Sequence, residues 1–169
     1  MATTLMVANW IKRVADDERQ RDAVRVRETE MAARKADLVR LNGQRLIDEL
    51  RATLVRDVAA FRDEFAGDAT RDIVVDDIEP GGGFVVHKPA PAAVSLTIVP
   101  NLEGAVMACH YRFVPTNGLP PREERFDVVF AGDGGETLQL KHYGTGQVFP
   151  TCDALSEFLL VPVFTGRPR

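Results

Sequence analysis

The sequence predicts an α+β fold with a long N-terminal helical arm, an antiparallel meander sheet of five to seven strands, and a short C-terminal helix. Two observations carry this prediction. All ten prolines and all but one of the glycines, residues that interrupt helices, follow residue 66. The apolar residues also recur with a helical period up to that point and with a period of two after residue 72. We expect a helical arm over residues 1–42 and an α+β domain over residues 43–169.

The arm is rich in charged residues and poor in apolar ones. Two opposite-charge pairs, Asp17 with Arg21 and Glu30 with Arg34, have the i, i+4 spacing that stabilises a helix. A thin apolar stripe remains, but charged residues interrupt it too often for a regular coiled-coil seam. The stripe predicts a solvated helix with one narrow contact face. Its candidate interaction residues are Trp10, Ile11, Val14, Val24, Met31 and Leu38.

The clearest helical pattern covers residues 44–66. Apolar residues spaced three and four apart share one face, namely Ile47, Leu50, Leu54, Val58, Phe61 and Phe65. Gly67 is a suitable stop for this helix. The only break signal before it is Asn42-Gly43, which either ends the arm in a helical hairpin or lies inside one long helix. We favour the long helix, because no strong helix cap follows.

Residues 72–149 alternate apolar and polar side chains between short turns. The connections are too short for parallel crossovers, so the strands must be antiparallel. Met107, Cys109 and Tyr111 alternate with His110 and other polar residues, which indicates a sheet covered on one face. The 44–66 helix is the expected cover. The pattern allows either an open sheet or one that closes toward a barrel.

A short helix is expected over residues 152–161. Thr151 is a suitable N-cap. Leu155, Phe158 and Leu159 would point into the core. Pro162 is expected to end this helix, because proline lacks the N–H that continues the hydrogen-bond ladder.

No arrangement of residues points to catalysis, and we expect no metal and no cofactor. Cys109 and His110 are adjacent in a strand and therefore point to opposite faces, so they cannot easily bind one ion. The glycines after Pro80 precede a strand rather than a helix, which favours a hairpin turn over a phosphate loop. With only two cysteines, Cys109 and Cys152, we expect no disulfide framework.

The charge pattern argues against nucleic-acid and membrane partners. The net charge is −4, and basic and acidic side chains are equal in number over residues 1–68. No apolar run is long enough to span a membrane. The first residues also lack the arrangement of a signal peptide, so we expect a cytoplasmic protein.

These features predict a non-enzymatic protein interaction or assembly module that acts through its helical arm. The partner would be another copy of the chain, giving a homo-oligomer, or another protein. Two alternatives stay open. The first is a small ligand- or peptide-binding domain that uses the polar face of the sheet around His110, Arg112 and Lys141. The second is an enzyme of unrecognised type.

Overall fold

The structure is a computed structural model that describes residues 8–89, 92–132 and 136–169. It has a long helix, a seven-stranded sheet and a second helix, so the predicted α+β class is confirmed. The chain forms two compact units, Met1–Asp37 and Leu38–Arg169. Helix α1 (Asn9–Glu64) contributes residues to both, and every other element belongs to the second unit.

Helix α1 continues without a break through Asn42-Gly43, as favoured from the sequence, and the hairpin alternative is wrong. Gly43 is buried and serves close packing rather than a turn. A Cβ atom at this position would lie 2.7 Å from Cδ2 of Leu102, which follows strand β3 (Ala93–Asn101). Only glycine lets the helix backbone approach this side chain so closely.

The sheet is an open antiparallel meander in which each strand pairs with the next one in sequence. Strand β1 and strand β7 form its two edges, so the described residues do not close into a barrel. The remaining strands are β1 (Val74–Ile78), β2 (Gly83–Lys88), β4 (Val106–Val114), β5 (Arg122–Gly132), β6 (Leu138–His142) and β7 (Val148–Phe149).

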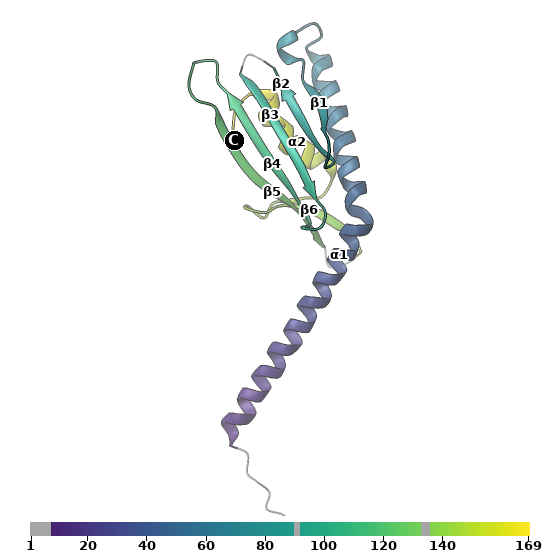
Figure 1. The fold of residues 1–169 in the computed structure, drawn as a ribbon, viewed down its shortest axis with the longest axis vertical. Coiled ribbons are helices and arrows are strands. Elements are labelled where there is room, and N and C mark those ends of the chain that lie inside the picture. The colour runs from purple at the N-terminus through teal and green to yellow at the C-terminus, as the bar shows by residue number, and fades with distance from the viewer. Residues whose placement is uncertain (1–7, 90–91, 133–135) are drawn as a thin grey trace, which may run out of the picture. The chain divides into compact units, whose positions relative to one another are not determined.

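The core lies between one face of the sheet and two helices. Leu50 and Leu54 of α1 are fully buried in this core, and the buried residues of α1 extend from Val39 to Val58. Helix α2 (Cys152–Thr165) lies behind β2 and β3, while the second half of α1 runs along β1 (Figure 1). The sheet supplies alternate side chains, as its pleat requires, including Val94, Leu96, Ile98, Met107, Cys109, Tyr111 and Phe113.

The prediction that Phe65 completes the buried apolar stripe of α1 is wrong. Phe65 is 38% exposed, because α1 ends at Glu64 and the chain leaves the helical path before Phe65 can reach the core. The guanidinium of Arg71 lies over its ring, 4.1 Å from the centroid. Phe61 is the last residue of the stripe that packs on the core, where its ring stacks on Phe164 at 4.0 Å.

Lys88 is a charged residue buried on the covered face of the sheet. It is buried, and its Nζ donates a hydrogen bond of 3.4 Å to the carbonyl of Phe164 near the end of α2. Burial lowers the pKa of this ammonium group, and the positive charge of Arg71 lowers it further. The carbonyl groups at a helix C-terminus attract a cation, which gives this buried charge a compensating contact.

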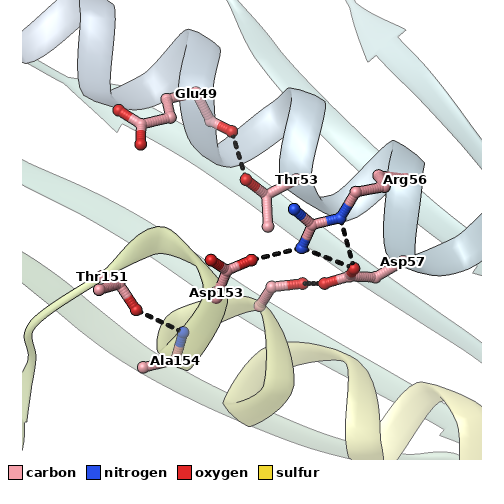
Figure 2. Close-up of polar contacts among 8 residues, drawn as sticks. Glu49, Thr53, Arg56, Asp57, Thr151, Asp153 and Ala154 are labelled. Atoms are coloured by element: carbon pink, nitrogen blue, oxygen red, sulfur yellow. Dashed lines mark hydrogen bonds and ion pairs between the residues drawn. The ribbon is translucent and has the colours of Figure 1, made fainter.

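Polar side chains connect α1 to the start of α2 (Figure 2). Ser156 is fully buried and donates a hydrogen bond of 2.6 Å to Oδ2 of Asp57. The guanidinium of Arg56 binds both Asp57 and Asp153, and so bridges the two helices. At the helix start, Thr151 acts as the predicted N-cap and accepts a hydrogen bond from the backbone N–H of Ala154.

Helix α2 is longer than predicted, since it continues through Pro162 to Thr165. Proline tolerates helical dihedral angles, and its missing N–H leaves only the carbonyl of Phe158 without its usual partner. Arg169 donates a hydrogen bond to that carbonyl and so replaces the missing donor. The helix ends instead at Gly166, whose φ of 69° is the left-handed conformation that favours glycine.

Candidate interaction surface

The arm of α1, residues 9–37, presents apolar side chains to solvent. Trp10 is 61% exposed and Met31 is 65% exposed, and Val14 and Val24 are also exposed. Within this part of the helix only Ala15 and Lys35 are half-buried, and the buried residues of α1 begin at Val39. The side chains that the sequence nominated for interaction are therefore accessible over the whole arm.

Four of these apolar residues share one narrow strip of the helix surface, which we call the seam. The seam residues follow each other in alternating steps of four and three, a spacing that keeps them on one face of a helix. Charged residues occupy the same strip between the apolar ones. In chain order the seam is Trp10, Val14, Asp17, Arg21, Val24, Glu28, Met31 and Lys35.

The remaining two nominated residues are placed differently. Ile11 is 43% exposed and lies beside the seam, one residue after Trp10. Leu38 is half-buried and belongs to the second unit, where it precedes the buried core residue Val39. The seam that is open to solvent therefore comprises residues 10–35.

Local ion pairs stabilise the arm as a helix. Arg19 binds Asp16 and Arg21 binds Glu18, each at 2.6 Å, and a longer contact of 3.4 Å joins Arg25 to Asp22. All three pairs have i, i+3 spacing and are exposed, so each contributes little. The predicted i, i+4 pairs are not among the ion pairs of the described residues. Arg21 reaches back three residues to Glu18 instead of pairing with Asp17, and Arg34 has no ion pair among the described residues.

One flank of the seam is basic, a feature that the sequence analysis missed. Residues at seven-residue steps line this flank, namely Arg13, Gln20, Arg27 and Arg34. Within residues 8–89, 92–132 and 136–169, no ion pair involves any of these three arginines. The equal numbers of acids and bases over residues 1–68 concealed this flank, and the seven-residue spacing of the arginines was the signal that could have identified it.

The residues of the alternative ligand site, His110, Arg112 and Lys141, do not lie together on the polar face of the sheet. His110 and Arg112 lie on the same face of β4, and His110 pairs with Arg125 across the ladder. Lys141 instead pairs with Val129, which pairs with Val106. Two strands and four residues therefore separate Lys141 from His110, roughly 16 Å at ordinary strand spacings. The nearest acidic contact of His110 Nε2 is Glu123, at 3.6 Å, which is too long for a hydrogen bond.

Both cysteines are buried core residues. Burial raises the pKa of the Cys109 thiol to about 12 and that of Cys152 to about 11, so both stay protonated near neutral pH. Their sulfur atoms form only weak contacts with backbone carbonyls. Among the described residues, no cluster of three histidine, cysteine or carboxylate side chains is arranged to hold a metal ion.

The second unit has surface hollows whose linings differ. One of ≈ 520 Å³ follows β4 and is lined mainly by apolar residues such as Phe113, Pro115 and Leu119, with Arg122 as its charged residue. Another, of ≈ 790 Å³, lies at the β1–β2 hairpin beside Asp48 and Asp77. The carboxylate of Asp77 is already paired with Arg51 at 2.7 Å, so it is engaged in a contact within the fold.

Two further findings bear on function. In the part of the chain that the structure describes, neither helix has an apolar stretch that could cross a membrane. Comparison of the chain with protein-family models, with curated proteins and with solved structures found no match. Any functional conclusion must therefore be drawn from the residues and their arrangement.

Proposed function

We propose that the protein is a non-enzymatic interaction or assembly module that binds its partner through the seam of α1. The observation that carries this proposal is the exposure of Trp10, Val14, Val24 and Met31 on one strip of a helix. None of the described residues before Val39 is buried. An apolar strip of this kind is normally covered in the functional state of a protein.

The physics of helix formation supports the same proposal. Isolated helices in water are marginally stable, and most helical stability in proteins comes from packing an apolar face. The exposed ion pairs of the arm are too weak to replace that packing. A partner helix laid along the seam would bury the apolar strip and stabilise the arm at the same time.

The proposal includes the cytoplasm as the working compartment and a protein as the partner, either a second copy or a different chain. The net charge of −4 supports a protein partner over a nucleic acid. The second candidate function, ligand binding on the polar face of the sheet, has less support. Its three residues, His110, Arg112 and Lys141, do not converge on one place.

Two matched substitutions test the seam. Val24 lies in the seam, whereas Val26 lies on the other side of the helix, and the two side chains are similarly exposed at 49% and 57%. Val24→Asp should abolish complexes that form through the arm. Val26→Asp introduces the same charge in the same helix and should leave those complexes intact.

The measurement compares the full-length wild type with both variants. Sedimentation gives the mass of each protein alone, and mass spectrometry identifies what each one retains from a cell extract. Circular dichroism checks that both variants keep their helix. Loss of a complex with Val24→Asp alone supports the proposal. If all three proteins show the same mass and the same retained proteins, the seam is not the interface.

A further inference from the structure

We infer that the partner of the arm is a different protein, with a helix that carries acidic residues beside its own apolar strip, and not a second copy of this chain. This inference rests on the proposed function, because it names the partner of the same seam. Charged residues lie both in the seam and on its flank. These charges oppose self-pairing in both orientations of two helices.

Parallel pairing of two identical arms is unfavourable within the seam. In a parallel two-stranded arrangement each seam residue faces its own counterpart. Asp17 would then face Asp17, and Arg21, Glu28 and Lys35 would each face a like charge. Like charges brought together in a desolvated seam repel one another, and these four contacts would equal in number the four apolar ones.

Antiparallel pairing of two arms reduces the like-charge repulsion within the seam but not the repulsion between the flanks. Placing Asp17 opposite Arg21 of the second copy also places Val14 opposite Val24, so these four positions become complementary, while Trp10 faces Glu28. A two-fold axis relates antiparallel copies, however, and it brings each flank against the same flank of the other copy. The basic flank would then face itself, with Arg13 beside Arg27 in this register.

The basic flank is available for a partner. Arg13, Arg27 and Arg34 are exposed and have no ion pair within the described residues, unlike Arg19, Arg21 and Arg25. In a pair of helices, the charged residues beside the apolar seam determine which partner binds. Three uncompensated arginines therefore favour a partner helix with glutamate or aspartate on the facing flank.

A pair of synthetic probe peptides tests this inference on the full chain. Each probe is a three-heptad helix with the same apolar strip. The acidic probe carries glutamates along both flanks of that strip, and the basic probe carries lysines at those positions. Binding is measured by fluorescence anisotropy of labelled probe. We expect the acidic probe to bind at least about tenfold more tightly than the basic probe, and high salt to reduce the difference.

A charge reversal on the chain provides the control. The variant Arg27→Glu/Arg34→Glu should lose the preference for the acidic probe and bind the basic probe better than the wild type does. The variant Lys12→Glu/Arg19→Glu changes the net charge equally but on the far side of the helix, so it should keep the preference. Circular dichroism confirms that both variants remain helical.

Each other outcome has a definite meaning. If both probes bind equally and Val24→Asp abolishes both, the acidic preference is wrong while the interaction seam stands. A wild type that sediments as a dimer dissociated by Val24→Asp overturns the choice of a different protein, again without overturning the seam. If neither probe binds and the chain retains no arm-dependent complex, both the inference and the proposed function fail.

Discussion

Gly43 lies directly against Leu102, so closely that a Cβ atom added to the glycine would come within 2.7 Å of Cδ2 of the leucine. This contact lets the middle of α1 sit against the chain that follows β3. It also explains how a glycine persists inside a long helix, where it is less favourable than alanine by about 1 kcal/mol.

Because of this contact, the effect of a substitution at Gly43 on stability should depend on the side chain at position 102. Gly43→Ala should gain much less stability than the ~1 kcal/mol expected for an unhindered helical site, because Leu102 must move. In a Leu102→Ala background the same substitution should give a larger gain, with Cγ1 of Val39 at 3.3 Å as the remaining close neighbour. Urea denaturation measures the free energy of unfolding of the four proteins in this cycle. Equal effects of Gly43→Ala in both backgrounds would contradict the contact.

The covering role of α1 predicts a large effect at Leu54. This side chain is fully buried among core residues, so Leu54→Ala should lower the free energy of unfolding by about 2–5 kcal/mol. Val55 is its exposed neighbour on the same helix, and Val55→Ala should change stability by less than about 0.5 kcal/mol. Denaturant titration of both variants checks the difference, and a small effect at Leu54 would show that α1 does not cover the sheet as described.

Buried thiols predict a loss of stability at alkaline pH. Burial raises the pKa of Cys109 from its ordinary value of 9.0 to about 12. Between these pH values the unfolded chain has released this proton while the folded chain still holds it, so stability falls as pH rises. Below pH 9 the contribution is fully present. We expect Cys109 to add a slope approaching about 1.4 kcal/mol per pH unit in that window.

The matching measurement follows the free energy of unfolding against pH for Cys109→Ala and for Val94→Ala. Both variants remove side-chain atoms from the core, but only the first removes a titrating group. The Cys109→Ala profile should be flatter than the wild-type profile between pH 9 and 12. An unchanged slope would mean that the thiol ionises in the folded chain as readily as in the unfolded one.

Trp10 gives a direct optical signal of the arm, because it is the only tryptophan in the chain. Since it is exposed, the free protein should show the emission of a solvated indole, and concentrated urea should hardly shift it. Binding of a partner helix should shift the emission to shorter wavelength. A blue emission from the dilute free protein that moves to the red on unfolding would show that the arm is already covered.

Much of the fold was predictable because its patterns are local. The spacing of Ile47, Leu50, Leu54 and Val58 identifies the buried face of α1 directly. Alternation in β3 to β5 similarly identifies the covered face of the sheet. Strand β7 has only two residues, too few for any period to appear. The extension of α2 beyond Pro162 depends on Arg169, a contact that no local pattern contains.

The candidate site was predictable only in part. Periodicity located the apolar strip, since Trp10, Val14, Val24 and Met31 recur on one face. The role of Arg27 and Arg34 required knowing which arginines are paired inside the chain, and that depends on side-chain conformation. The identity of the partner lies in the complementary surface of another molecule, which the period of a single helix does not specify.

The consecutive strand order of the sheet has a consequence for how the second unit folds. Every ladder joins neighbours in sequence, so each pairing closes only a short loop and loses little chain entropy. Such local pairing favours rapid assembly by successive hairpins. The distant contacts are those of α2 with β2 and with α1, including Ser156 with Asp57. We therefore expect the docking of the two helices, rather than the formation of the sheet, to limit the folding rate.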